Sequence, residues 1–274
     1  MVIRKRKNGS QNIEQKTWKS FFWFVPNLIT FSSIICGLWA MYAVFTGQSA
    51  IISCCLIVIA CFLDAMDGRT ARFLGVDGTF GIELDSLADF FTFGISTMFV
   101  FFSYLVSNYD IQNQYIIFGI LMLFPVCMAS RLARFNVGAL SNDEPKEIKD
   151  FKKKFFCGMP APAGAIALLL PVVLDSLQEQ QLFSCYCIPV AYALLISFLL
   201  ISRFPMPSIK SMQFGFNNVK ETLTTIFVLF LIVFFFMRPI HCIIAVSLMY
   251  IVNIPIAFVR YSVGMKKIKQ KISK

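Results

Sequence analysis

The sequence predicts an all-α protein, a polytopic membrane bundle of about eight transmembrane helices. The first observation is composition: of 274 residues, 57% are hydrophobic and only 15% are charged, and the mean hydropathy is +0.71. A soluble domain is normally about a quarter charged, and a disordered chain is poor in aromatic residues, whereas this chain has 31 phenylalanines. The second observation is that apolar runs recur at a length of about 20 residues, which is the length of helix that crosses a bilayer.

Eight apolar runs follow a polar, basic N-terminal arm. The arm, residues 1–25, is predicted to lie partly in the headgroup layer, because Trp18 and Trp23 stand close to Lys16 and Lys19. The runs are predicted as helices over residues 28–45, 50–73, 81–106, 114–137, 161–177, 182–201, 223–237 and 240–259. Only an Arg-Pro pair separates the last two runs, so a kinked hairpin or a re-entrant pair is the alternative there.

The loops between the runs alternate in charge, and this alternation predicts the topology. Lysine and arginine gather in the arm, in the loops after the fourth and sixth runs, and in the tail, whereas loops 46–49, 107–113 and 175–181 contain none. Basic loops stay on the cytoplasmic side, so both termini are predicted to be cytoplasmic, with Arg238 as the exception. The net charge of +10 then belongs mostly to one membrane face, and the apolar spans exclude a basic nucleic-acid binder.

Four aspartates interrupt the apolar pattern where the second run ends and the third begins. Asp64 and Asp67 are three positions apart and Asp85 and Asp89 are four apart, so each pair lies on one helix face. A short loop makes the two helices antiparallel neighbours, so the four carboxylates converge. Because close carboxylates repel one another strongly in a low dielectric, they must bind cations or be partly protonated. Oxygen ligands without His or Cys favour Mg²⁺ or Mn²⁺, and two such ions suit displacement at phosphorus.

Small residues and an arginine share these helix faces. Gly68, Ala71 and Gly81 leave room for a bulky group to approach the backbone, and Arg72 can contact a phosphate. The alternative is a carboxylate-lined transporter, in which the small residues only pack helices. The aspartates cluster at one end, however, and no second acidic site is visible on the last four runs. The single histidine, His241, leaves little material for a His-based triad or a zinc site.

These residues fit one long pattern, D-x-x-D-G-x-x-A-R-x(8)-G-x-x-x-D-x-x-x-D, which begins at Asp64 and ends at Asp89. By this signature the chain resembles the CDP-alcohol phosphotransferase family, whose members move a phosphatidyl or similar group from a CDP-linked donor to an alcohol. The resemblance implies a two-metal site, with Asp89 as general base on the acceptor hydroxyl. It implies metal ligation by Asp64, Asp67, Asp85 and Asp89, catalytic roles for Asp85 and Asp89, and room for the cytidine and diphosphate at Gly68, Ala71 and Gly81.

Further stretches resemble one branch of the family, the membrane-embedded phosphatidylserine synthases. These stretches are residues 26–30, 131–137, 158–165 and 202–210. The resemblance implies CDP-diacylglycerol as donor, L-serine as acceptor, and CMP and phosphatidylserine as products. The same chemistry with glycerol 3-phosphate, inositol phosphate or choline as acceptor is the alternative.

Four polar residues in these stretches are candidate substrate ligands. Asn27 and Thr30 are predicted either to hydrogen-bond the nucleotide or to cap the helix that begins beside Pro26. Arg131 and Arg134 lie three positions apart on one helix face and suit the carboxylate that serine brings. The alternative for this pair is two arginines that extend to the interface from a helix end.

The resemblance divides the chain into an arm, a core, an extension and a tail. The arm spans residues 1–25 and the six-helix catalytic core spans residues 26–210. Two additional helices lie within residues 211–260, and a basic tail spans residues 261–274. The predicted partners are CDP-diacylglycerol, L-serine and membrane lipid, without nucleic acid, and the family makes a homodimer plausible. We expect an integral protein of the cell or inner membrane, with the active site on the cytoplasmic side.

Overall fold

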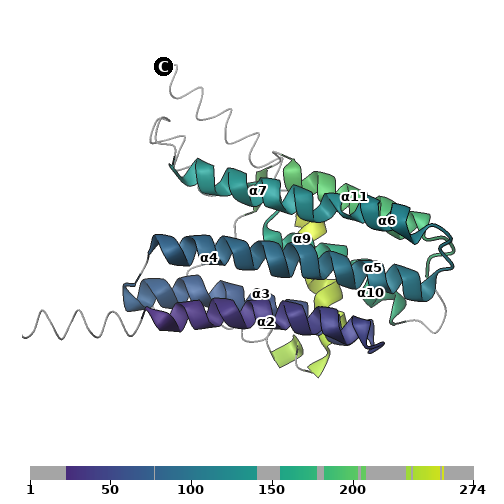
Figure 1. Cartoon of the computed structure of the whole chain (residues 1–274), viewed down its shortest axis with the longest axis horizontal. Helices are drawn as coiled ribbons and strands as arrows, with labels where there is room; N and C mark the ends of the chain where they lie inside the picture. Colours follow the sequence, from purple (N-terminus) through teal and green to yellow (C-terminus); the bar gives the residue numbers. More distant parts are fainter. Residues whose placement is uncertain are drawn as a thin grey trace, which may run out of the picture.

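The computed structural model describes residues 23–76, 78–140, 155–177, 182–202, 205–207, 233–235, 237–253 and 255. Nearly all of these residues are helical, and the long helices run alongside one another (Figure 1). The helices are α2 (Phe24–Phe45), α3 (Ala50–Leu74), α4 (Thr79–Asp89), the π-helix η1 (Phe90–Ser96), α5 (Thr97–Asn108), α6 (Gln114–Leu121), α7 (Leu123–Leu140), α9 (Ala161–Leu168), α10 (Leu170–Asp175), α11 (Cys187–Ile201) and a C-terminal helix (Pro239–Asn253).

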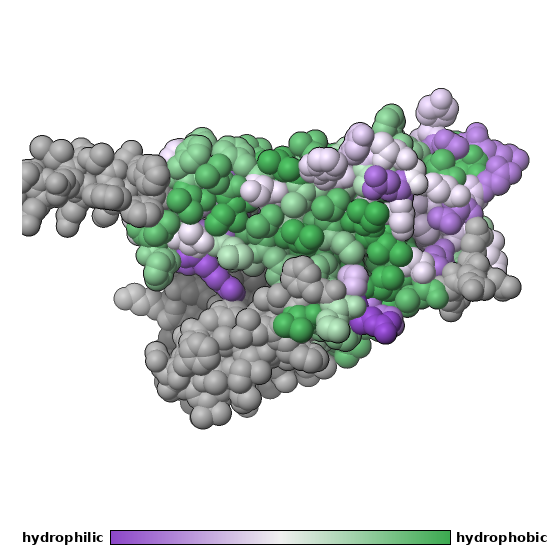
Figure 2. Space-filling model, turned by 90° about the horizontal axis from the view of Figure 1, so that it is seen from below, coloured by the Kyte–Doolittle hydropathy of each residue, from purple (hydrophilic) through white to green (hydrophobic). Residues whose placement is uncertain are grey.

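Four helical segments are long and apolar enough to cross a membrane, and three apolar helices are shorter. The long ones are Phe24–Phe45, Ala50–Leu74, Thr79–Asn108 and Gln114–Val137; the short ones are Ala161–Asp175, Cys187–Ile201 and Pro239–Asn253. Hydrophobic residues cover the middle of the face seen in Figure 2, and hydrophilic residues gather at the end where α5 turns into α6. The prediction of a helical bundle with apolar segments of membrane-spanning length is therefore confirmed, whereas the count of eight transmembrane helices stays a prediction. Nearly all of the arm, the basic loop after α7, most of the run 223–237 and the tail lie outside the described residues.

The first two predicted helices form an antiparallel hairpin. Near the turn, the Ser53 hydroxyl donates a 2.8 Å hydrogen bond to the carbonyl of Ala40, and the Ser49 side chain caps α3 by accepting from the amide of Ile51. The hairpin places the beginning of α2 beside the end of α3. The side chains at residues 23–30 can therefore reach the aspartates of α3.

The third predicted helix is a composite, because the π-helix η1 separates α4 from α5. The hydroxyls of Ser96 and Thr97 donate to carbonyls five positions back, at Phe91 and Thr92. On the other side, η1 meets α2 at Gly37, where an added Cβ would lie 2.9 Å from Ser96 Oγ and 3.3 Å from Thr92 Cα. The sequence analysis predicted one uninterrupted helix here, since hydropathy does not distinguish a π turn from an α turn.

Two further predicted helices are broken, in each case close to a proline. The run 114–137 divides into α6 and α7 at Met122, just before Pro125, and the run 161–177 divides into α9 and α10 at Leu169, just before Pro171. Proline has no N–H, so the carbonyl four positions earlier loses its helical partner. In the second break that carbonyl belongs to Ala167, and the hydroxyl of Tyr192 on α11 donates to it at 2.9 Å. The run predicted over 182–201 becomes helical only from Cys187 onward.

One short strand pair departs from the all-α prediction. Strand β1 (Phe155–Cys157) pairs antiparallel with β2 (Pro205–Pro207), so the segment before α9 lies beside the segment after α11. Gly158 follows β1 with φ +84°, and a Cβ there would lie 2.9 Å from the carbonyl oxygens of both Leu200 and Ser202. Only glycine suits this close crossing of two backbones. The predicted core is helical, with this clasp at one end.

Candidate active site

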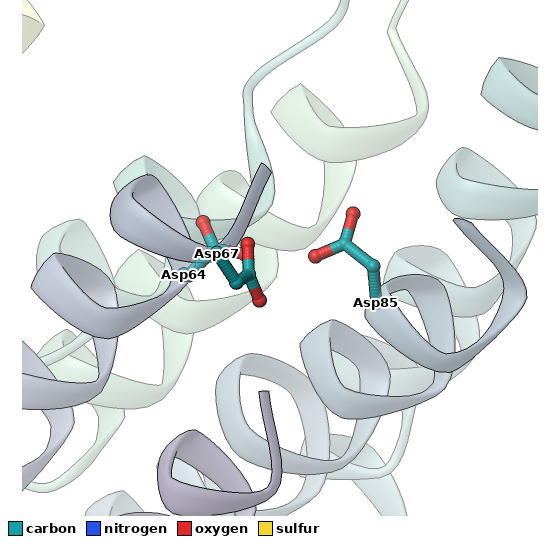
Figure 3. A group of neighbouring side chains, drawn as sticks. All are labelled: Asp64, Asp67 and Asp85. Atoms are coloured by element: carbon teal, nitrogen blue, oxygen red, sulfur yellow. The ribbon is translucent and has the colours of Figure 1, made fainter. Parts of the chain in front are cut away.

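Three of the four predicted aspartates form one group between α3 and α4. Asp64 and Asp67 project from α3 toward Asp85 on α4 (Figure 3). One carboxylate oxygen from each of the three lies within 4.8 Å of the other two. Asp67 is buried, and Asp64 and Asp85 are half-buried. The spacing of the aspartates thus brings them together as predicted.

Asp67 is held by residues of two helices. Oδ2 of Asp67 accepts a 2.7 Å hydrogen bond from the hydroxyl of Thr30 on α2, and Oδ1 accepts from the amide of Gly68. The Asp67 carboxylate also interacts electrostatically with Asp85 and with Arg72. Thr30, predicted as a nucleotide ligand or a cap, therefore has a third role in the structure: it orients a candidate metal ligand.

Asp89 adjoins the group without belonging to it. Its carboxylate contacts Asp64 through a side-chain hydrogen bond and interacts with Asp85 and with Arg131 on α7. Oδ1 of Asp89 is buried and has no hydrogen-bond partner among the described residues. A buried carboxylate oxygen without a partner is costly, so this atom is suited to receive a ligand.

The donor set fits a divalent metal. Asp64, Asp67 and Asp85 offer only hard carboxylate oxygens, and such ligands suit Mg²⁺ or Mn²⁺ rather than a soft metal. A cation there would also offset the mutual repulsion of carboxylates that lie this close in an apolar bundle. The structure therefore contains an aspartate cluster that can bind a divalent cation.

The two arginines of α7 separate in the structure. Arg131 is 8% exposed and interacts with Asp89 and Asp64. Arg134 instead donates from Nη1 to the carbonyl of Ile201 at 2.8 Å, at the end of α11. Of the predicted pair, Arg131 faces the aspartates, and Arg134 joins α7 to α11.

The small residues and Asn27 lie around the same end of the bundle. Asn27 is buried, and its Nδ2 donates to the carbonyl of Trp23 at 3.2 Å. A Cβ added at Gly81 would lie 3.7 Å from Asn27 Oδ1, so α2 and α4 approach each other there. A Cβ added at Gly68 would meet the Arg72 guanidinium at 3.6 Å. Ala71 is half-buried and Arg72 is exposed.

Two contacts beside the aspartates escaped the sequence analysis. Asn136 Nδ2 on α7 donates to the hydroxyl of Ser86 at 3.1 Å, next to Asp85. Tyr250 of the C-terminal helix interacts with Arg131. Asn136 is a polar residue in an apolar run, which is a usable signal, whereas the local sequence gives none for Tyr250.

Comparison with known proteins agrees with the pattern at this site. Residues 23–198 match the CDP-alcohol phosphatidyltransferase family. A CDP-diacylglycerol–serine O-phosphatidyltransferase of Helicobacter pylori is 30% identical over 79% of this chain and 83% of its own length. Proteins of the same name are 32% identical in Mycobacterium leprae, over 94% of this chain and 79% of the relative, and 30% identical in Methanocaldococcus jannaschii, over 67% and 76%. The chain belongs to the CDP-alcohol phosphatidyltransferase family.

Proposed function

We propose that this protein transfers the phosphatidyl group of CDP-diacylglycerol to L-serine, forming phosphatidylserine and releasing CMP. The observation that carries the proposal is the site itself: three clustered aspartates lie beside Asp89, and Arg131 faces Asp89. The carboxylates suit a metal-assisted displacement at phosphorus, and the buried arginine suits an acceptor that carries a carboxylate. The names of the relatives support the same reaction.

The transfer is a direct displacement. The serine hydroxyl oxygen bonds to the phosphorus that bears diacylglycerol, the bond from this phosphorus to the bridging oxygen breaks, and CMP leaves with that oxygen. Oδ1 of Asp89 takes the hydroxyl proton, because it is the buried carboxylate oxygen that has no partner among the described residues. This displacement needs no covalent nucleophile, since positioning and electrostatics provide most of the catalysis in such transfers.

The predicted site residues divide into metal ligands and substrate ligands. Asp64, Asp67, Asp85 and Asp89 would hold divalent cations, two ions of Mg²⁺ or Mn²⁺. Bound there, such ions neutralise charge that develops on the phosphates. Gly68, Ala71 and Gly81 leave space for the cytidine diphosphate, Arg72 contacts a phosphate, and Asn27 and Thr30 lie next to that space. Arg131 binds the serine carboxylate, whereas Arg134, the other predicted ligand, bonds the carbonyl of Ile201.

The membrane topology is part of the proposal. Eight spans, six in the core and two in the extension, place both termini and the aspartates at the cytoplasmic face. Four long apolar helices and three shorter ones support this arrangement, as does the absence of lysine and arginine from loops 46–49, 107–113 and 175–181. A homodimer stays a prediction from the family.

One assay tests reaction and acceptor together. Purified full-length protein is given CDP-diacylglycerol, Mg²⁺ or Mn²⁺, and in separate reactions L-serine, glycerol 3-phosphate, inositol phosphate or choline, and CMP is measured. We expect CMP release that depends on serine. CMP release with one of the other alcohols but not with serine would make that alcohol the acceptor. No CMP release with any of the four alcohols would reject the enzyme class.

A further inference from the structure

The C-terminal helix packs against the catalytic core. It lies beyond residues 23–198, which match the family. Cys242 and Ile243 are buried in the core, and Ser247, which is 1% exposed, donates to the carbonyl of Ile166 on α9 at 3.4 Å. Just before this helix, the ring of Phe235 lies 6.0 Å from that of Phe62 on α3. The C-terminal helix is therefore packed into the bundle, beside α3 and α9.

The buried face of this helix ends at a tyrosine. Ile243, Ser247 and Tyr250 follow one another at helical spacing of four and three positions, so they share one face. The hydroxyl oxygen of Tyr250 is buried and has no hydrogen-bond partner among the described residues. A buried hydroxyl without a partner destabilises a fold, whereas phenylalanine would fill the same space without that cost.

This hydroxyl interacts with the arginine of the active site. Arg131 interacts electrostatically with Tyr250 on one helix and with Asp89 on another. The buried side-chain oxygens without a partner in the described part of the chain are Asp89 Oδ1 and Tyr250 Oη, and Arg131 faces both. A small molecule that carries a hydroxyl at one end and a carboxylate at the other could give each of these two oxygens a hydrogen-bond partner and place its negative charge beside Arg131.

We propose that Tyr250 is a specificity residue for the acceptor: its hydroxyl donates a hydrogen bond to the acceptor carboxylate, beside Arg131, while Asp89 receives the acceptor hydroxyl. The inference rests on the proposed function and deepens it, because it assigns a role to a helix outside the matched core. Discrimination against alcohols that lack a carboxylate then comes partly from this helix, since such an alcohol leaves the buried Tyr250 hydroxyl without a hydrogen-bond partner.

The test compares two tyrosine variants of the full-length protein. Tyr250→Phe removes only the hydroxyl. Tyr192→Phe is the matched control, because its hydroxyl bonds the carbonyl of Ala167 on α9, a contact with no residue of the aspartate group. For each protein, KM is measured for serine and for CDP-diacylglycerol, kcat/KM is measured for serine and for ethanolamine, which has no carboxylate, and the unfolding temperature is recorded.

We expect Tyr250→Phe to raise the KM for serine about tenfold or more, the value of one hydrogen bond to a charged group. The KM for CDP-diacylglycerol and the use of ethanolamine should stay within about twofold of the wild type, and the unfolding temperature should not fall. Tyr192→Phe should lower the unfolding temperature and leave the serine KM unchanged.

Three outcomes would overturn the inference. An unchanged serine KM in Tyr250→Phe would show that the hydroxyl does not contact the acceptor, and an equal rise in both KM values would place it at the donor. A loss of thermal stability together with a proportional loss for serine and ethanolamine would make it a structural residue. Failure of the proposed function would show in the wild type, as an absence of CMP release with serine. Failure of the Tyr250 inference would show only in the variant, while the wild type stays active with serine.

Discussion

The hydroxyl of Thr30 on α2 donates a 2.7 Å hydrogen bond to Oδ2 of Asp67 on α3. Both residues are buried, at 4% and 5% exposure. A short hydrogen bond to an ionised group both orients and strengthens a carboxylate ligand. The first helix of the bundle thus contributes to the candidate metal centre without supplying a ligand of its own.

Removal of this hydroxyl should weaken the metal site. Thr30→Val keeps the shape of the side chain and loses the donor, so we expect a loss of about 1.5–3 kcal/mol of support for Asp67. The readout is the Mg²⁺ or Mn²⁺ concentration that gives half-maximal CMP release, which should rise about tenfold or more. Thr30→Ser is the matched control, since it restores the hydroxyl. If both variants keep the wild-type requirement for metal, the Thr30 contact does not support the site.

Neutralisation of a ligand should nearly abolish turnover. Asp85→Asn and Asp89→Asn each remove a negative charge at the cluster, and we expect a loss of at least about 100-fold in kcat with normal membrane insertion. Glu83→Gln is the matched control on the same helix, because Glu83 is exposed and is not part of the metal-binding group. Retained activity in both aspartate variants would reject the metal-site assignment.

Chelation should reversibly stop the reaction. Incubation with EDTA removes divalent cations, and CMP release is expected to cease because the clustered carboxylates alone cannot neutralise the diphosphate. Added Mg²⁺ or Mn²⁺ should restore CMP release, and the ion that restores it at the lower concentration is the one that the site binds more tightly. Activity that persists in EDTA would contradict a metal-assisted transfer.

The two arginines of α7 should behave differently. Arg131 faces the aspartates, so Arg131→Ala should raise the KM for serine more than that for CDP-diacylglycerol. Arg134 bonds the carbonyl of Ile201, so Arg134→Ala should lower the unfolding temperature, with a smaller effect on the serine KM. Kinetics and thermal unfolding of both variants test this division, and the reverse pattern would make Arg134 the acceptor ligand.

A substitution at the strand clasp should destabilise the fold. Gly158→Ala places a Cβ 2.9 Å from two carbonyl oxygens at a residue with φ +84°, and we expect a loss of at least about 1–3 kcal/mol. Gly119→Ala is the control, because an added Cβ at this helical position meets nothing within 4 Å; there alanine should be neutral or mildly stabilising. Thermal unfolding in detergent measures both, and equal stability of the two variants would contradict the close crossing at Gly158.

The aspartates could be predicted from the sequence because helical spacing alone places them. Asp64 and Asp67 share a face of α3, and a short connection forces α4 alongside, so no long-range knowledge is needed to bring Asp85 near. The Thr30 contact depends on the rotation of α2 about its axis, which packing decides. The helix breaks beside Pro125 and Pro171 could have been predicted, because proline lacks the backbone N–H that an uninterrupted helix needs. Each apolar run was instead predicted as one helix, because its length matches a membrane span.

Tyr250 illustrates what local sequence cannot supply. It lies 119 positions after Arg131, in a helix that resembles any other apolar segment. The sequence analysis correctly predicted that helix and left its role open. Its contact with the core emerges only when α9, α7 and the C-terminal helix are assembled.

The π-helix η1 determines how α4 and α5 are rotated relative to each other about the axis of the continuous helical segment. A π turn accommodates one more residue than an α turn, and each residue of an α-helix corresponds to a rotation of about 100°. The carboxylates of α4 can therefore be aimed at α3 while α5 keeps its own apolar face toward the core. In genetic terms, η1 behaves as a one-residue insertion directly after Asp89. A single-codon deletion there would preserve the hydropathy of the span and yet turn one half of it away from its neighbours.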